Sequence, residues 1–280
     1  KGLGVVASRD IAASEVLLGE APVLSISGIE ALRGEVAARH PTLSQSMQSS
    51  HMRQLNTLVA RDPGVINLVA RGIAETSTMK RSEFLKLGDA FETEEFLPGS
   101  WVRVEGGEKS PQGTLLSLEG QPPEAVTVLT SAGEQRAAFS EVRRLSSKTV
   151  SGISLTNAVT MSGKDTAEVY ASFARFNHAC VPNARAIQAD GMRGVVATCD
   201  IEAGMEICVS YFEESKCLPA VGMQAIADRL GCDSEVLHVA LVRQQLYSKW
   251  GFWCCCLRCS GYISEADDAL ARWLDLAGRK

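Results

Sequence analysis

The spacing of hydrophobic and polar positions changes along the chain, and each change predicts a different kind of element. Short apolar runs separated by polar turns predict strands over residues 1–26. Residues 29–97 carry apolar positions at helical spacing, most clearly over 50–60 and 65–74, with a Pro-Gly break between these two stretches. We expect this part to be mainly helical and to stay helical over residues 82–91.

The pattern over residues 98–145 is different, because short apolar runs alternate with turns rich in Gly and Pro. The clearest strand candidates are residues 101–104, 113–116, 125–129 and 136–139. Such spacing predicts a small closed barrel of the SH3 or Tudor type. A methyl-lysine reader needs a cage of several aromatic rings, and this segment offers only Trp101 and Phe139. A structural or docking insert is therefore the favoured interpretation.

From residue 151 onward the pattern predicts strands and tight loops again. Strands are expected at 195–198 and 207–211, on either side of a glycine turn. Residues 218–247 predict helix with one break, and residues 265–277 predict the start of another helix.

Composition narrows the range of functions. With 280 residues and 45% hydrophobic content the chain can build a sizeable core and more than one domain. A net charge of −5 gives no sign of general affinity for nucleic acid and mildly favours cationic partners such as lysine-rich tails. No apolar run reaches the length of a membrane span, so we expect no membrane association.

Nine cysteines are present, and four of them fall between Cys254 and Cys259. The run at 252–259 reads FWCCCLRC and contains C-x-C-x-x-C, which can converge on one zinc ion. Three local thiolates leave one position for a distant ligand or a water molecule. A row of small buried hydrophobic residues is the alternative, but it does not explain the clustering. Crowded thiols also indicate a reducing compartment, the cytoplasm, the nucleus or both.

Three further stretches carry polar or glycine-rich signals. Residues 177–183 read NHACVPN, and Cys180 within them could supply the missing zinc ligand. Residues 197–211 predict a strand, a tight turn and a strand ending at Tyr211. Residues 1–4 read KGLG, where glycine lets backbone approach a ligand closely.

In this order the four signals resemble the SET-domain protein-lysine methyltransferases. Residues 177–183 are similar to the family's N-H-S-C-x-P-N signature, with Ala179 in place of serine, and 204–211 to its G-E-E-L…Y motif, with Met205 in place of the first acid. The nearest subgroup is the SMYD type, whose catalytic domain is split by an insertion. Members normally carry a cysteine-rich MYND finger there, but residues 28–147 contain no cysteine.

The resemblance implies an α+β, β-rich SET-domain fold with a pseudoknot-like threaded segment. It implies the following divisions: the SET domain at 1–27 and 148–213, a helical insertion at 28–97, a small β-barrel insertion at 98–147, a helical segment at 214–248, a post-SET zinc segment at 249–262 and the start of a C-terminal helix at 263–280.

The resemblance also implies roles for single residues. Tyr211 is the catalytic residue, and Trp250 stands where the SMYD type usually places a tyrosine on the lysine channel wall. The residues expected to bind S-adenosylmethionine are Gly2, Leu3, Gly4, Asn157, Ala174, Arg175, Asn177, His178, Tyr211 and Phe252. The expected zinc ligands are Cys180, Cys254, Cys256 and Cys259.

The implied activity is methyl transfer from S-adenosylmethionine to lysine in histone or non-histone proteins. The alternative is a zinc-braced SET-like scaffold that recruits protein partners without turnover. A zinc-dependent nucleic-acid binder is disfavoured by the acidic charge balance and by the lack of an obvious basic helix.

Overall fold

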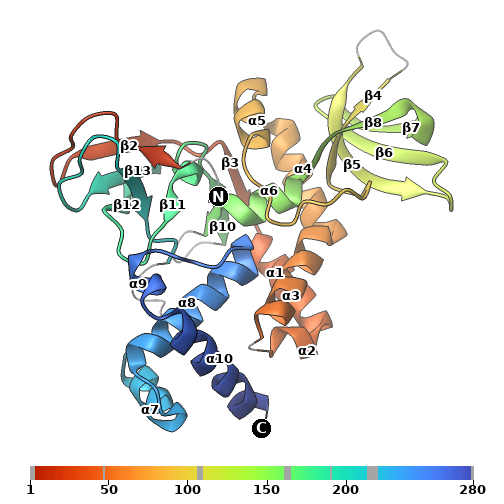
Figure 1. Ribbon diagram of the computed structural model, residues 1–280. Coiled ribbons are helices and arrows are strands. Elements are labelled where there is room, and N and C mark those ends of the chain that lie inside the picture. Colours follow the sequence, from red (N-terminus) through yellow and green to blue (C-terminus); the bar gives the residue numbers. More distant parts are fainter. Residues whose placement is uncertain are drawn as a thin grey trace. The chain divides into compact units, whose positions relative to one another are not determined.

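The chain folds as a mixture of α-helices and β-strands (Figure 1). The computed structural model describes residues 4–46, 48–105, 110–160, 165–189, 191–212 and 220–278. Two compact units share these residues: the first comprises Lys1–Ala21, Gln45–Arg53 and Ser172–Lys280, and the second Pro22–Ser44 and Gln54–Ala171. Among the helices in the described ranges, none combines the length and the apolar character needed to cross a membrane.

The first unit contains two small three-stranded sheets. Their strands are β1 (Val5–Val6), β2 (Val16–Glu20), β11 (Asn177–His178), β12 (Ala184–Ala189), β13 (Met192–Ala197) and β14 (Glu206–Val209). The sheet orders are β1-β14-β11 and β12-β13-β2. Strand β11 runs parallel to β14, with Asn177 opposite Cys208 and His178 opposite Val209. This pairing brings the stretch at 177–183 beside the stretch that ends at Tyr211.

Helices complete the first unit. They are α7 (Ala220–Leu230), α8 (Ser234–Trp250), α9 (Leu257–Ser260) and α10 (Ile263–Gly278). Gly231 separates α7 from α8 with a φ of +64°, and Asp233 caps the first turn of α8. Helices α8 and α10 pack side by side (Figure 1). An ion pair of 2.8 Å between the buried Arg243 of α8 and the exposed Asp267 of α10 joins them. The helices predicted at 218–247, with one break, and at 265–277 are confirmed.

The helices of the second unit follow the helical pattern predicted for residues 29–97, except near the end of that stretch. They are α1 (Ile29–Arg39), α2 (Pro41–Ser44), α3 (Ser49–Arg61), whose first residues belong to the first unit, α4 (Pro63–Glu75) and α5 (Thr78–Leu85). The prediction of helix over 82–91 is wrong beyond Leu85. The carboxylate of Asp89 accepts a hydrogen bond of 2.7 Å from the Phe91 amide, which closes a turn where a helix would have continued.

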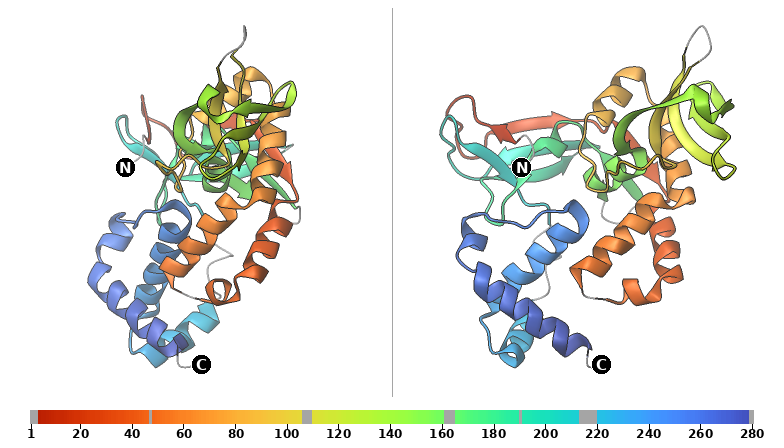
Figure 2. Two further views of the ribbon diagram at one scale, coloured as in Figure 1. Left: turned by 90° about the vertical axis from the view of Figure 1, so that its right-hand side faces the viewer. Right: turned by 45° about the vertical axis from the view of Figure 1, so that its right-hand side comes forward.

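The four strand candidates of residues 98–145 are confirmed, and a fifth strand joins them. Strands β4 (Ser100–Val104), β5 (Gln112–Glu119), β6 (Ala125–Thr130), β7 (Gly133–Ala138) and β8 (Val142–Thr149) form one antiparallel sheet in the order β7-β6-β5-β4-β8. The sheet is twisted (Figure 2). Register shifts interrupt the β4–β8 and β5–β6 pairs, and irregularities of this kind increase local twist. Val102, Leu115, Val126 and Val128 form its buried core. The closed barrel stays a prediction.

Residues 150–157 correct a further expectation. They form helix α6 (Val150–Asn157) instead of strands and loops, and only then follow β9 (Ala158–Thr160) and β10 (Thr166–Val169). Strand β10 pairs with both β9 and β3 (Leu24–Ser27), in the sheet order β3-β10-β9. Thr149 caps α6 by accepting a hydrogen bond from the Gly152 amide, and Ser151 donates one of 2.6 Å to the Ala60 carbonyl. Burial and capping therefore override the low helix propensity of this stretch.

Candidate functional site

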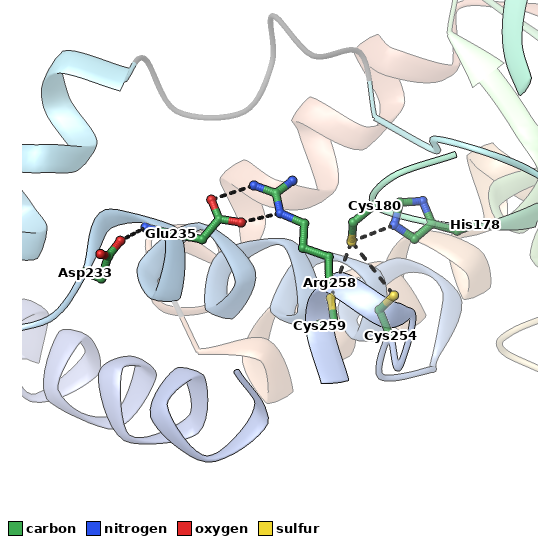
Figure 3. Close-up of polar contacts among 7 residues, drawn as sticks. All are labelled: His178, Cys180, Asp233, Glu235, Cys254, Arg258 and Cys259. Atoms are coloured by element: carbon green, nitrogen blue, oxygen red, sulfur yellow. Dashed lines mark hydrogen bonds and ion pairs between the residues drawn. The ribbon is translucent and has the colours of Figure 1, made fainter. Parts of the chain in front are cut away.

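Four cysteines from two distant stretches meet in the first unit. Cys180 follows β11, Cys254 and Cys256 lie in the turn after α8, and Cys259 lies in α9. Their sulfur atoms all lie within 4.8 Å of one another. The Cys180 sulfur is 3.9 Å from that of Cys254 and 3.4 Å from that of Cys259 (Figure 3). The predicted meeting across more than seventy residues is therefore present.

This cluster has the donor set and the burial of a metal site. Cys254 and Cys259 are buried, and Cys180 and Cys256 are half-buried, whereas Cys255 is exposed and lies outside the cluster. Hydrogen bonding to Cys254 raises the pKa of the Cys180 thiol, and the same contact lowers the pKa of Cys254. Four sulfurs this close can be ionised together only with a cation among them. The cluster could hold one metal ion.

His178 joins the cysteine cluster to the end of strand β14. Its Nδ1 atom accepts a hydrogen bond of 3.1 Å from the Tyr211 amide. Its Nε2 atom lies 3.4 Å from the Cys180 sulfur (Figure 3). The position of Tyr211 therefore depends on the loop that carries Cys180.

Tyr211 sits among aromatic rings with its hydroxyl group fixed. The hydroxyl donates a hydrogen bond of 2.8 Å to the Phe176 carbonyl. The ring lies 4.9 Å from that of Trp250 and 6.5 Å, edge to face, from that of Phe252. Burial raises the pKa of Tyr211 to about 12, and the nearby Cys208 and Glu206 add to this shift. The residue is therefore a neutral hydrogen-bonding group at physiological pH.

Asn177, Gly4 and Glu206 form a tight group on the β1-β14-β11 sheet. The Asn177 side-chain amide donates a hydrogen bond of 2.6 Å to the Glu206 carboxylate. A Cβ atom on Gly4 would lie 2.3 Å from that carboxylate and 2.7 Å from the Asn177 amide nitrogen. Only glycine fits at position 4 without a rearrangement, which explains the second glycine of the G-x-G signal. Sequence reasoning assigned no role to Glu206.

The turn η2 (Phe173–Arg175) carries Ala174 and Arg175 and is held by a residue that the sequence did not single out. The Glu20 carboxylate, at the end of β2, accepts hydrogen bonds from the amides of Ser172 and Phe173. The turn leads directly into Phe176, whose carbonyl receives the Tyr211 hydroxyl. No short motif surrounds Glu20, so only the fold reveals this contact.

An open pocket of about 250 Å³ adjoins the cysteine cluster. Its lining includes His178, Cys180, Phe212 and Arg258. Arg258 makes a bidentate ion pair with Glu235 of α8 (Figure 3). No local sequence pattern predicts this pair, because the two residues are 23 positions apart in the chain.

The remaining predicted site residues lie in different surroundings. Gly2 and Leu3 lie outside the described residues. Asn157 belongs to the second unit, where its side-chain amide donates hydrogen bonds of 2.7 Å to the carbonyls of Gly88 and Ile153. Phe252 is 36% exposed, so part of its side chain is open to solvent.

Comparisons with known proteins agree with this arrangement. Residues 2–212 match the SET domain. A search among curated proteins found no match. The matched range includes Gly4, Asn177, Cys180 and Tyr211 and ends before the turn that carries Cys254, Cys256 and Cys259. The geometry thus adds the C-terminal cysteines to a site that the family match leaves incomplete.

Proposed function

Because the chain belongs to the SET-domain family, we propose that it transfers a methyl group from S-adenosylmethionine to the ε-amine of lysine in other proteins. Family members generally have this activity. The observation that carries the proposal is the convergence around Tyr211: its hydroxyl is fixed by the Phe176 carbonyl, directly before the Asn177–His178 strand, and its ring lies 6.5 Å from the ring of Phe252. Histone and non-histone proteins that present a lysine are the proposed substrates.

The residues around Gly4 suit an S-adenosylmethionine site. Gly4 lies so close to the side chains of Asn177 and Glu206 that no Cβ atom fits between them, and glycine backbone is the kind that can approach a ligand closely. In this proposal the backbone near Gly2, Leu3 and Gly4, together with that of Ala174 and Arg175, borders the methionine part of the cofactor. Asn177 and His178 hold its polar edges, and the Phe252 ring stacks on adenine. Asn157 is proposed as a further contact by resemblance alone.

Zinc is the metal that the cysteine centre fits. Tetrahedral zinc with sulfur ligands at about 2.3 Å places those sulfurs about 3.8 Å apart. The Cys180 sulfur lies 3.9 Å from Cys254 and 3.4 Å from Cys259, which brackets this value. Four cysteine ligands leave no open position, so the proposed role of the zinc is structural. It would brace the turn that carries Phe252 against the loop that follows His178.

S-adenosylmethionine, when bound, would supply an electrophilic methyl group and leave as S-adenosylhomocysteine, and the residues of this chain bring the lysine amine to it. The amine must first lose its proton to solvent, since free lysine has a pKa near 10.4. Desolvation in a narrow apolar channel and the positive charge of the sulfonium both disfavour the ammonium form and lower the pKa of the bound lysine. Neutral Tyr211 then orients the amine through its hydroxyl group. Most of the rate gain in this scheme comes from positioning.

Trp250 forms the proposed wall of the lysine channel. Its ring lies 4.9 Å from that of Tyr211, and the ammonium of Lys249 lies 4.4 Å above its centre. An indole is bulkier than the tyrosine usual in the SMYD type and brings no hydroxyl group. We propose that this side chain narrows the channel beside Tyr211.

The subgroup and the site of action are part of the proposal. A split SET domain of the SMYD type without a MYND finger is consistent with a chain that has no cysteine in residues 28–147. Unpaired, crowded cysteines fit a reducing compartment, so we propose action in the cytoplasm, the nucleus or both.

The alternative is a SET-like scaffold that binds protein partners without turnover. A thermal shift with S-adenosylhomocysteine is a first test, because a ligand at about 100 times its Kd stabilises the native state by about 2.7 kcal/mol. The proposed enzyme predicts a higher Tm with this ligand. No shift at saturating ligand would favour the scaffold.

A further inference from the structure

Arg258 occupies an unusual place for a charged side chain, in the short stretch between Cys256 and Cys259. It lies in α9, and its side chain is 27% exposed. The guanidinium makes two hydrogen bonds to the Glu235 carboxylate, one of them 2.7 Å long between Nη2 and Oε2 (Figure 3). A bidentate contact of this kind fixes the orientation of both side chains.

Glu235 is itself held in place. It lies in the first turn of α8, and its amide donates a hydrogen bond of 2.7 Å to the capping carboxylate of Asp233 (Figure 3). A carboxylate in the first turn is also stabilised by the helix dipole. The ion pair therefore ties the rigid beginning of α8 to the cysteine turn.

The other end of α8 is joined to the same turn through the chain. The helix ends at Trp250 and Gly251, and Cys254 follows three residues later. Gly251 adopts a φ of +74°, which redirects the chain sharply. Helix α8 is thus connected to the cysteine turn at both ends, by the ion pair at its start and by the backbone at its end.

The positive charge of Arg258 complements the negative charge expected for a metal-bound cysteine cluster. Four thiolates around one divalent cation carry a net charge of −2, and Arg258 lines the same pocket as the ligand Cys180. Its positive charge offsets part of the excess negative charge of the centre. Glu235 keeps the guanidinium aligned and thereby keeps that charge at the pocket next to the cysteine cluster.

On the basis of the proposed zinc centre, we infer that Arg258 is a positioning residue, which stabilises the metal-bound thiolates by its charge and is held in register by Glu235. Through this pair the occupied centre also fixes helix α8, and with it Trp250 and Phe252 at the methyl-transfer site. Loss of the pair loosens the zinc and weakens S-adenosylhomocysteine binding without removing any ligand.

The test measures how fast the purified full chain loses zinc to an excess of a coloured chelator. Arg258→Gln removes the positive charge, and Glu235→Gln removes the carboxylate that pairs with it. Arg258→Lys keeps the positive charge but cannot make the bidentate contact. Arg136→Gln is the matched control, because Arg136 also makes two hydrogen bonds to one carboxylate, that of Glu119, in the other unit.

We expect Arg258→Gln and Glu235→Gln to lose zinc about 10-fold to 100-fold faster than the unchanged protein, the range seen when partners of metal ligands are removed. The rate of zinc loss from Arg258→Lys should lie between the rates of these two variants and that of the unchanged protein. Arg136→Gln should release zinc at the unchanged rate. The S-adenosylhomocysteine affinity measured by calorimetry should fall in the same order.

A charge swap separates this role from that of a simple structural link. In Glu235→Arg/Arg258→Glu the two charges still attract each other, but a carboxylate now lies beside the thiolates. We expect the swap to recover the Tm that the single variants lose, while zinc is still lost rapidly. Full recovery of zinc retention by the swap would overturn the inference.

Two other results would also overturn the inference, in distinguishable ways. If the unchanged protein retains one zinc and all variants release it at the same rate, Arg258 has no positioning role and the proposed function stands. If the unchanged protein binds no zinc at all, the proposed metal centre fails together with the inference.

Discussion

The hydroxyl group of Tyr211 donates a hydrogen bond of 2.8 Å to the backbone carbonyl of Phe176. Phe176 directly precedes Asn177, which pairs through β11 with the strand that leads to Tyr211. A single stretch of backbone therefore sets the direction of the tyrosine hydroxyl and the position of the asparagine. In the proposed reaction these two side chains face the amine and the cofactor, so their relative geometry is fixed before either binds.

Replacing the hydroxyl of Tyr211 tests its role in transfer. Tyr211→Phe keeps the ring packing with Trp250 and removes only the group that orients the amine. We expect at least about a 100-fold loss of methyl transfer, since misplacement of a reacting group costs this much. The affinity for S-adenosylhomocysteine, measured by calorimetry, should stay nearly unchanged. Full activity in this variant would refute the assigned role.

The raised pKa of Tyr211 makes a prediction at high pH. Burial raises it to about 12, whereas a tyrosine in an unfolded chain has a pKa of about 10. The folded state thus holds the phenolic proton more tightly, and this contribution to stability is fully present below pH ~10 and lost as the pH rises through ~12. Difference absorbance of tyrosinate between the unchanged protein and Tyr211→Phe should show ionisation only above pH ~10. Ionisation of Tyr211 below that pH would contradict the buried, neutral state.

Cys180 is predicted to be essential for the metal centre. Cys180→Ser should reduce zinc from about one ion per chain to well below that, because a four-cysteine site loses a quarter of its ligands. Metal binding and local folding are coupled, so proteolysis near Phe252 should become faster. Cys255→Ser is the control, since Cys255 is exposed and outside the cluster. Equal zinc content in the Cys180 variant, measured by atomic absorption, would mean that this residue is not a ligand.

Gly4 tests the proposed cofactor site by adding a single methyl group. In Gly4→Ala the new Cβ would meet the Glu206 carboxylate and the Asn177 amide at less than 3 Å and push them apart. We expect about a 10-fold or greater loss of S-adenosylhomocysteine affinity by calorimetry, which corresponds to about 1.4 kcal/mol. Gly19→Ala adds the same methyl group in β2 with no atom within 4 Å and should bind normally. Equal affinities for both variants would argue against cofactor binding at Gly4.

Local sequence motifs predicted the residues at the site itself, but not the residues that hold them in place. The stretches around Cys180 and Tyr211, and the cysteine turn, carry residue types whose chemistry is visible in a short window. Their meeting followed from the need for a fourth ligand, and the structure brings the four sulfurs together. Gly4 could likewise be singled out because glycine marks places of close approach.

The supporting carboxylates could not be predicted in this way. Glu20 and Glu235 act on partners that the fold brings to them, and an isolated glutamate in a sequence usually marks a solvated surface. Glu206 stands within the motif at 204–211, but its hydrogen bond with Asn177 depends on the pairing of β14 with β11. Helix α6 was missed for a related reason, because its caps and its buried position depend on tertiary contacts. Propensity and periodicity do not contain that information.

The most direct test of methyl transfer is a lysine peptide array incubated with the zinc-loaded chain and S-adenosylmethionine tritiated on its methyl group. The account predicts label on a subset of lysine peptides, lost when that lysine is replaced by arginine and lost with Tyr211→Phe. An array that stays unlabelled with the unchanged, zinc-loaded chain, or that is labelled equally by Tyr211→Phe, would contradict it.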